Sequence, residues 1–598
     1  MKQLVSKYLK SNFHYLHFFY SVLKLRLFFV FLISFLYGLV DAVSLTIFIP
    51  LFQIATREKN APIEKSDDVF LEVFNFFNIN PTVNTILIIM LASFMFKALF
   101  RYTDVYYRAI TTSIFIKNIK KKLLLEISEV KYSKYVTINF GTIQNSVTTE
   151  IHIICSAFLQ YISVMQSAIF VIVYIGLSFL TNPKFTLIVI VGGWLSRFLF
   201  KSLYKNSEKL SNDIAKKNNK LSGLVMQQIT NFKYLKSTAL MKGYLKKINF
   251  TIDDIEKDLV VLGKTSAKVM SIREPIIVLF LVIAIYIQIN ILGGKFNSLI
   301  IILLFFYRAF GSLMTVQQSW TAFLKYVGSI TQYVDFISDV KNCKEENEGK
   351  EFTTFNDKIV LNDVFFEYND QAKILKDISL DIHKNTTLAF VGKSGSGKTT
   401  LVNIICGLLT PTSGKILFDN NEMSSYNIDS IRSKIGFISQ ETVVFNDTLF
   451  NNITFWQEKN DSTLKRFNEV IKKVDLTEFV ENSEFKEDIV LGDNGVVMSG
   501  GQRQRLSIAR ELYKDIDILI LDEATSALDS QTERFIQDSI EALKGQITII
   551  VIAHRLSTIK KADKIVLVEN GSIVAQGSYD ELLINSETFT NMVSLQEL

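Results

Sequence analysis

Long apolar runs separated by polar breaks fill the first half of the chain, whereas from residue 355 onward short apolar stretches alternate with helical patterns and glycine-rich turns. A helix needs about 20 apolar residues to cross the core of a bilayer. Six runs approach or exceed this length, too many to find apolar partners inside one soluble domain. The pattern predicts a six-helix transmembrane domain over residues 27–325. The runs are Leu27–Phe52, Ile86–Tyr107, Ile151–Leu180, Phe185–Phe200, Pro275–Leu292 and Leu299–Trp320.

The length and charge of each connection between the runs predict on which side of the membrane that connection lies. Asn182-Pro183 and Gly293-Gly294 leave room only for tight turns, which we place on the outer side. The opposite ends are long and basic: residues 201–270 carry 14 Lys against six Asp plus Glu, so the positive-inside rule places these helical extensions in the cytoplasm. Residues 1–26 mix basic and aromatic residues without a small-residue cleavage site. This favours an amphipathic helix on the inner membrane face over a removable signal peptide.

Composition narrows the class of protein. Hydrophobic residues make up 48% of the 598, too many for a disordered chain, and the net charge of +6 does not indicate a nucleic-acid binder. The three cysteines stand at unrelated spacings without a nearby histidine, so neither a disulfide framework nor a zinc module is expected. The charged segment at residues 337–354 is typical of a linker, and we expect a soluble domain over residues 355–598.

The soluble half carries a phosphate-binding loop. An apolar strand pattern at Leu388–Val391 runs directly into Gly-Lys-Ser-Gly-Ser-Gly-Lys-Thr, which matches the full P-loop template between a strand and a helix. Its glycines let backbone amides point at phosphate oxygens, Lys398 supplies charge to the β and γ phosphates, and Thr399 can hold Mg²⁺. This predicts an α/β P-loop ATPase domain that binds ATP and Mg²⁺. The predicted nucleotide contacts are Gly392, Ser394, Gly395, Ser396, Gly397, Lys398, Thr399 and Thr400.

A second buried-strand pattern delivers the acids that hydrolysis needs. Residues 518–521 are Ile-Leu-Ile-Leu, and Asp522 and Glu523 follow them. Asp522 would bind Mg²⁺ and Glu523 would polarise the attacking water. The expected chemistry is hydrolysis by an in-line water, with the protein supplying positioning and electrostatic stabilisation.

Between these motifs stands Met498-Ser499-Gly500-Gly501-Gln502, and with it the whole chain resembles an ATP-binding cassette (ABC) exporter half-transporter. The resemblance implies that this segment caps the nucleotide bound to the other subunit. Two positions depart from the family pattern, Met498 where Leu is usual and Asp493 where exporters usually carry Glu. The remaining family motifs follow in order: Tyr368 for adenine stacking, Gln440 for the glutamine loop beside Mg²⁺, Ser526-Ala527-Leu528-Asp529 for the D-loop, and His554 for the switch histidine at the γ phosphate.

The resemblance also implies an assembly. Because the cap acts in trans and each motif occurs once, one chain cannot complete a site and a dimer is required. Intact Glu523, His554 and cap residues favour a homodimer with two active sites over a heterodimer. The nucleotide-binding domain is expected in the cytoplasm, with the spans in the bacterial inner membrane.

Charged residues inside the apolar runs bear on the substrate. A charge near the bilayer centre costs roughly 2.5–3.5 kcal/mol on insertion scales, so such residues usually face a cavity and a partner. The spacing of 0, +4, +7 and +11 places four of them on one stripe of the second span. They are Lys97, Arg101, Asp104 and Arg108 in the second span, Arg273 at the inner end of the fifth and Arg308 within the sixth.

Two interpretations of these charges stay open. In the first, Lys97, Arg101, Arg273 and Arg308 form a cationic lining that captures a phosphate or pyrophosphate head group. In the second, the cations pair with Asp41 or Asp104 inside the membrane, or extend along the helix to the inner interface.

The layout of the membrane half is similar to that of bacterial lipid-linked oligosaccharide flippases, which also have an external helix after the first span and basic residues in the second, fifth and sixth spans. The nucleotide domain follows the spans on the same chain, which favours export over import, and no N-terminal peptidase domain precedes them, which disfavours a leader-cleaving peptide exporter. We therefore expect flipping of a lipid-linked pyrophosphate oligosaccharide. The alternatives are a general lipid, drug or peptide exporter, or an ATP-gated channel or regulator.

Overall fold

The chain forms two compact units in the computed structural model. One comprises Met1–Val130 and Thr137–Lys344, and the other comprises Lys131–Val136 and Glu345–Leu598. The structure describes residues 13–48, 51, 82–181, 183–290, 296–368, 373–522, 538, 540–553 and 555–597. The predicted amphipathic segment lies partly outside these residues, as does most of the loop after the first span.

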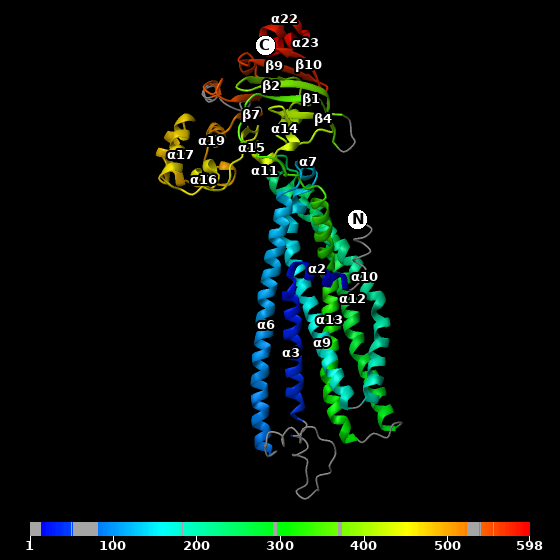
Figure 1. The fold of residues 1–598 in the computed structure, drawn as a ribbon. Helices are drawn as coiled ribbons and strands as arrows, with labels where there is room; N and C mark the ends of the chain where they lie inside the picture. The colour runs from blue at the N-terminus through cyan, green and yellow to red at the C-terminus, as the bar shows by residue number, and fades with distance from the viewer. Residues whose placement is uncertain are drawn as a thin grey trace. The chain divides into compact units, whose positions relative to one another are not determined.

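The first unit is built from long helices that lie side by side (Figure 1). Among the described residues, three helices are long and apolar enough to cross a membrane: Leu25–Thr46, Val83–Ser128 and Phe140–Phe179. The predicted fourth and sixth spans fall within α10 and α13, and the described part of the fifth, residues 275–290, falls within α12. The helices of this unit are α2 (Phe13–Leu23), α3 (Leu25–Thr46), α6 (Val83–Ser128), α8 (Phe140–Asn145), the π-helical turn η1 (Ser146–Glu150), α9 (Ile151–Thr181), α10 (Pro183–Thr230), α11 (Phe232–Ser237), α12 (Met241–Asn290) and α13 (Phe296–Lys341).

Four of these helices are much longer than a bilayer is thick. α6 has 46 residues, α10 48, α12 50 and α13 46. At about 1.5 Å per residue each is roughly 70 Å long, more than twice the bilayer core. Each therefore continues from its apolar run into a polar extension. Pro275 lies inside α12, at the start of its apolar run, where it removes one helical hydrogen bond.

Aromatic side chains form the core of this unit. Phe19 of α2 is fully buried, with ring centroids 5.6 Å from Phe115 of α6 and 5.1 Å from Phe158 of α9. Phe115 and Phe158 stack at 4.5 Å. Such ring pairs add to the free energy gained by burial. The short helix α2 is thus packed into the bundle through one face.

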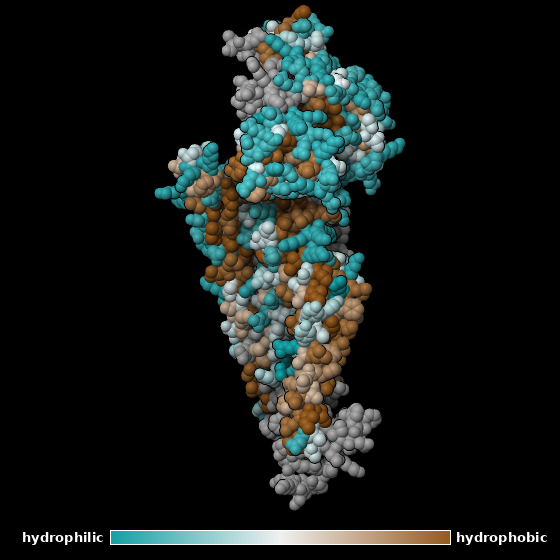
Figure 2. Space-filling view, turned by 90° about the vertical axis from the view of Figure 1, so that its left-hand side faces the viewer, coloured by the Kyte–Doolittle hydropathy of each residue, from teal (hydrophilic) through white to brown (hydrophobic). Residues whose placement is uncertain are grey.

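The outward surface of the bundle is apolar, as expected for contact with lipid. Figure 2 shows brown, hydrophobic side chains over the long helices. On α6, five large apolar residues recur at helical spacing and are exposed in the single chain. They are Ile88, Leu91, Met95, Leu99 and Tyr102.

The second unit contains two sheets. A six-stranded sheet has the order β10-β9-β3-β8-β7-β6, parallel except at β10, and an antiparallel sheet has the order β2-β1-β4-β5. The strands are β1 (Lys358–Phe366), β2 (Leu375–His383), β3 (Thr387–Val391), β4 (Ser413–Phe418), β5 (Asn421–Glu422), β6 (Ile435–Ile438), β7 (Ile518–Asp522), β8 (Thr548–Ile552), β9 (Lys564–Glu569) and β10 (Ser572–Gly577).

Both faces of the six-stranded sheet are covered, which is why its strands are continuous apolar runs. Leu519 and Val551 belong to the core on one face, while Ile520 and Ile550 belong to the core on the other. The helical membrane unit and the α/β unit together confirm the predicted fold class. The helices are α14 (Lys398–Ile405), α15 (Ile428–Ser433), α16 (Leu449–Thr454), α17 (Asp461–Lys473), α18 (Thr477–Glu481), α19 (Gly500–Tyr513), α21 (Leu556–Ile559), α22 (Tyr579–Asn585) and α23 (Glu587–Glu597), with α7 (Tyr132–Tyr135) in the same unit.

Candidate functional site

The predicted nucleotide residues gather at one edge of the six-stranded sheet. The carboxyl ends of parallel strands meet at the same edge, where α/β proteins bind ligands. Gly392 follows β3 directly, Gln440 comes two residues after β6, and Asp522 is the last residue of β7. β8 ends at Ile552 between β3 and β7, so the segment after it leaves from the same edge. The topology thus brings together motifs that are up to 160 residues apart in sequence.

The P-loop has the backbone that phosphate binding needs. Gly397 has a φ of 105° and starts α14, and a Cβ at Gly392 would lie 2.1 Å from the Val568 carbonyl oxygen, so neither position accepts a side chain. Lys398 is buried and its Nζ donates to the carbonyl oxygens of Gly392 and Lys393 at 2.9 and 3.0 Å. The ammonium group is therefore already held at the mouth of the loop, at the start of α14.

The polar groups of the loop fit a nucleotide with its metal. The Ser396 side-chain oxygen is buried without a hydrogen-bond partner among the described residues, which a phosphate oxygen would supply. Thr399 is exposed at the start of α14. Together with Asp522 and Gln440 it provides the hard oxygen ligands that Mg²⁺ prefers. Ser394 and Gly395 are also exposed, so the cradle is open on that side.

Tyr368 lies beside the P-loop helix. Its hydroxyl lies near the Thr400 side chain, its ring packs edge-on against Phe366 at 4.8 Å, and burial raises its pKa. The ring is thus held by Phe366 next to the P-loop helix. The adenine-stacking role of Tyr368 and the nucleotide contact of Thr400 stay predictions.

The signature segment forms an exposed helix N-terminus. Ser499 caps α19: its Oγ accepts from the Gln502 amide at 3.2 Å, and Gln502 Oε1 accepts from the Ser499 amide at 2.8 Å. Both Ser499 and Gly500 are exposed, and a Cβ at Gly500 would meet nothing within 4 Å. A helix N-terminus with open amides favours an anion. The segment can therefore accept an anion.

The two departures from the family pattern have structural roles. Met498 is buried in the core beside α19, where its flexible thioether fills the position that leucine usually takes. Asp493 accepts a hydrogen bond from the Asn446 side chain at 2.9 Å. This bond ties its loop to the segment that follows Gln440.

Three predicted site residues lie outside the described part of the chain. Glu523, Asp529 of the D-loop and His554 stay predictions. Their neighbours support the assignment, because Asp522 and Ala553, which flank Glu523 and His554, stand at the sheet edge that carries the P-loop.

Comparison with known proteins agrees with this geometry. A family model of the ABC transporter transmembrane region matches residues 27–313, and a second model, described as ABC transporter, matches residues 375–526. The heterocyst differentiation ATP-binding protein HepA of Nostoc sp. is 32% identical over 512 residues, covering 84% of this chain and 82% of that protein. The chain belongs to the ABC transporter family.

Other comparisons describe the transporter further. The ATP-dependent lipid A-core flippase of Paraburkholderia xenovorans is 30% identical over 517 residues, covering 84% of this chain and 85% of that protein. A solved bacterial Atm1-family ABC exporter with ATP bound superposes with a TM-score of 0.79 at 19% identity, covering 97% of this chain and 99% of that one, which shows the fold. The predicted ABC exporter half-transporter is confirmed, and with it ATP binding and ATP hydrolysis coupled to transport.

Within the membrane unit of the transporter, Lys97 is paired. Its Nζ forms an ion pair with Asp41 of α3, which also accepts a hydrogen bond from the Tyr174 hydroxyl of α9. We call Asp41, Lys97 and Tyr174 the Asp41 clasp. It joins α3, α6 and α9 through groups that are largely buried.

A second polar cluster joins the same three helices. Asp104 of α6 is only 1% exposed; its carboxylate accepts from Ser34 of α3 at 2.8 Å and from Gln166 of α9 at 3.0 Å, and pairs with Arg108 at 2.7 Å. Arg108 also donates to Gln166 Oε1 at 2.9 Å. We call Ser34, Asp104, Arg108 and Gln166 the Asp104 clasp. Every charge in it is compensated, as buried charges require.

The other two described cations of the predicted lining are free. Arg101 and Arg308 are exposed in the single chain, and neither makes a hydrogen bond or ion pair with a described residue. Arg273 lies within α12, and its side chain is outside the described part. The sequence did not reveal Tyr174, Gln166 or Ser34, which are ordinary polar residues whose spacing of seven or eight within α3 and α9 is the only signal.

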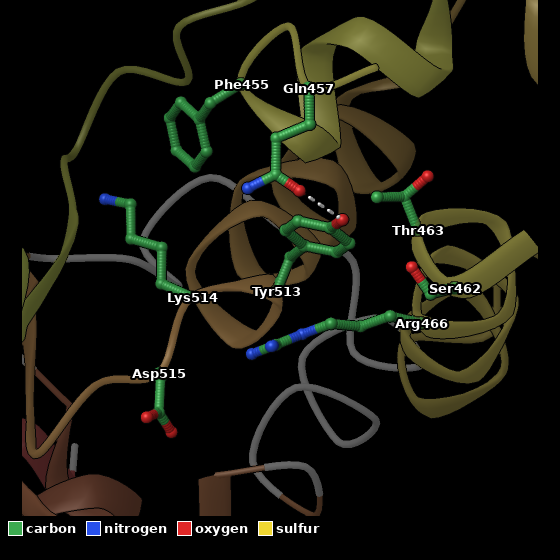
Figure 3. Close-up of a pocket in the computed structure, with 8 residues that line it drawn as sticks. All are labelled: Phe455, Gln457, Ser462, Thr463, Arg466, Tyr513, Lys514 and Asp515. Carbon is green, nitrogen blue, oxygen red and sulfur yellow. Dashed lines mark hydrogen bonds between the residues drawn. The ribbon is translucent and has the colours of Figure 1, made fainter. Parts of the chain in front are cut away.

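The α/β unit has a further pocket away from the nucleotide motifs. Figure 3 shows the residues that line it, which include Arg466 of α17 and Tyr513 at the end of α19. The pocket has a volume of about 470 Å³. The Arg466 guanidinium lies 5.2 Å from the Tyr513 ring, Lys514 Nζ lies 4.7 Å from the Phe455 ring, and the Tyr513 hydroxyl donates to Gln457 Oε1 at 2.9 Å. Lys514 also pairs with Glu511 at 2.7 Å, outside the residues that line the pocket.

Proposed function

We propose that the transporter is a homodimeric flippase of the bacterial inner membrane that moves an amphipathic lipid with an anionic phosphate or pyrophosphate head, with a lipid-linked oligosaccharide as the best candidate. One observation carries this: Arg101 and Arg308 belong to apolar helices and make no hydrogen bond or ion pair with a described residue. An uncompensated cation in the membrane is costly and usually marks a substrate path. Lys97 and Arg273 remain predicted members of the same lining.

The relatives support a lipid substrate at a coarser level. One is named a lipid A-core flippase, and its similarity extends over the membrane half as well as the nucleotide half. The apolar surface of the bundle and the two free arginines fit a substrate that has a lipid tail and a negatively charged head.

We propose that two copies share each nucleotide. In one copy Lys398 and Ser396 hold the phosphates, Thr399, Gln440 and Asp522 hold Mg²⁺, and Glu523 polarises the attacking water. Bound Mg²⁺ would neutralise charge on the phosphates. The other copy brings the amides at the start of its α19 to the γ phosphate, which is why that helix end is exposed in the single chain.

The test is head-group selectivity in proteoliposomes. We expect a polyprenyl-diphosphoryl sugar to stimulate ATPase activity and to be flipped, whereas a neutral lipid of the same chain length does neither. The Arg101→Gln/Arg308→Gln double variant should lose the stimulation, while Lys121→Gln, which removes an exposed charge from the polar extension of α6, should keep it.

Two results would favour the alternatives. Equal stimulation by neutral lipids or drugs would indicate a general lipid, drug or peptide exporter. Nucleotide-dependent passive flux without ATP turnover would indicate a channel or regulator.

A further inference from the structure

The membrane unit buries a carboxyl group that belongs neither to the nucleotide site nor to the two clasps. Glu150 is the last residue of the π-helical turn η1 and is only 2% exposed. The turn stands between α8 and α9 and interrupts the α-helical path there. π-helical turns are rare and are found frequently at functional sites. The position of Glu150 is therefore a candidate for a role of its own.

Polar groups from three helices surround this carboxyl group. Glu150 Oε1 accepts a hydrogen bond from the Asn145 side chain of α8 at 3.1 Å. The same Asn145 amide donates to the Asn219 side chain of α10 at 2.5 Å, and Asn219 donates to the Gln332 side chain of α13 at 2.8 Å. Ser329 of α13 lies beside Glu150. Glu150 thus stands at one end of a polar chain that joins α8, α10 and α13.

The charge of Glu150 has no compensation among the described residues. Its Oε2 atom is buried without a hydrogen-bond partner, and no described cation pairs with either oxygen. No described titratable group of α6, α8, α9, α10 or α13 acts on it electrostatically. The nearest titratable residues on α9 and α10, which are His152, Lys216 and Lys220, are exposed.

Close packing restricts water around these groups. α8 and α10 touch backbone to backbone, because a Cβ at Gly141 would lie 2.4 Å from the Gly223 Cα atom. Asn145 and Ser329 are each only 4% exposed. A carboxylate that is buried without a counter-ion is strongly disfavoured, and such a group takes up a proton instead. The packing around Glu150 therefore favours the neutral acid.

We propose that Glu150 is a proton-binding site of the transporter, which holds one proton while α8, α10 and α13 are packed around it and releases the proton when they separate during transport. The step is an acid–base reaction: the carboxyl O–H bond breaks, water takes the proton, and the carboxylate that remains becomes hydrated. Because three helices build the surroundings of this one group, a change in their packing changes its proton affinity. The inference goes beyond the proposed function and does not depend on which substrate is moved.

The direction of the pH effect follows from linkage. A hydrated glutamate titrates near pH 4.3, so above about pH 5 the separated state has lost its proton while the packed state keeps it. The packed state then holds one more proton, and rising pH disfavours it. The equilibrium shifts by about tenfold for each pH unit until the packed site itself loses the proton.

Infrared difference spectroscopy of the full-length protein in nanodiscs is the direct test. We expect the carbonyl stretching band of a protonated carboxylic acid at pH 7 in the difference between the wild type and Glu150→Gln. Asp253→Asn is the control, because Asp253 of α12 is exposed and makes no ion pair with a described residue, and it should give a carboxylate band. A carboxylate band for Glu150 at pH 7 would overturn the proposal.

A second variant keeps the test valid if Glu150→Gln folds poorly. Glu150→Asp retains the acid on a shorter side chain, so its acid band should persist at a changed frequency. Melting gives an independent measurement: between about pH 6 and pH 8 the wild type should lose thermal stability relative to Glu150→Gln, while Asp253→Asn follows the wild type. Parallel melting curves of the wild type and Glu150→Gln over this range would contradict the proton site.

The link to transport is tested by comparing two states of the same protein. The acid band of Glu150 should lose at least half of its intensity in either the nucleotide-free or the vanadate-trapped protein, with Glu150→Gln in the same state as the reference. Equal intensity in both states would show that the proton is a fixed part of the structure, and its release during transport would be wrong.

Discussion

Ser211 of α10 and Gly328 of α13 meet backbone to backbone. The Ser211 hydroxyl donates to the Lys325 carbonyl oxygen at 2.7 Å and accepts from the Gly328 amide at 3.1 Å. The Ser211 carbonyl oxygen lies so close that a Cβ at position 328 would be 2.4 Å from it. The two helices therefore touch at a point that has room only for glycine.

A methyl group at this crossing should separate the helices. We expect Gly328→Ala to lower the free energy of unfolding by about 1–3 kcal/mol, because the clash is with backbone that cannot rotate away. The measurement is thermal melting in detergent. Gly263→Ala is the control, since a Cβ there meets nothing within 4 Å, and it should melt at or above the wild-type temperature. Equal melting of the two variants would contradict the close contact.

Replacing the predicted catalytic acid should uncouple binding from turnover. Glu523→Gln keeps the size of the side chain but cannot polarise water, so ATP binding should persist while hydrolysis stops and the dimer stays closed. ATP binding by filter assay, steady-state ATPase and size-exclusion chromatography with ATP measure the three effects. Multiple-turnover activity near that of the wild type would remove Glu523 from this role.

The trans arrangement can be tested with mixed dimers. Ser499→Arg damages the site whose Lys398 belongs to the other subunit, and Lys398→Ala damages the site in its own subunit. A dimer of one chain of each kind therefore has one doubly damaged site and one intact site. We expect nucleotide to occupy the intact site and to be hydrolysed there. If both sites of the isolated mixed dimer fail to bind ATP, the assignment of Ser499 to the opposite site is wrong.

Cys406 should resist alkylation in the folded protein. It ends the P-loop helix α14, is 5% exposed, and burial raises its pKa to about 12. The reactive thiolate is therefore almost absent at pH 7 to 9, and the sulfur is also inaccessible. Mass spectrometry after maleimide treatment should find Cys406 unmodified until denaturant is added, with the half-buried Cys343 as the comparison. Modification of Cys406 in native protein at pH 8 would show that α14 opens.

The sequence predicted those features that local chemistry determines. The P-loop template carries its own backbone requirement, so the residues around Lys398 were found from spacing alone. The first and last residues of the helices were not predicted correctly. The apolar run Ile86–Tyr107 marks a span, but α6 runs from Val83 to Ser128. Hydropathy predicts which part of a helix lies in lipid. The helix itself can continue past the membrane into water, so its ends cannot be predicted from hydropathy.

The partners of the charged residues in the membrane unit could not be predicted from the sequence for a different reason. The stripe from Lys97 to Arg108 was visible in one helix, but its two interpretations could not be separated from that helix. The answer depends on how α3 and α9 are rotated about their axes, which packing contacts such as Gly38 with Phe170 decide. The structure divides the stripe: Lys97 and Arg108 are paired, whereas Arg101 makes no ion pair with a described residue.

The length of α6, α10 and α13 has a mechanical consequence. A continuous helix of roughly 70 Å behaves as a stiff lever, since its backbone hydrogen bonds run through without a joint. A tilt of about 10° at one end displaces the other by about 12 Å, several times the length of a hydrogen bond. A small rotation at one end of such a helix therefore becomes a large displacement at the other end. In α12, Pro275 removes one of these hydrogen bonds, so the helix bends more easily there.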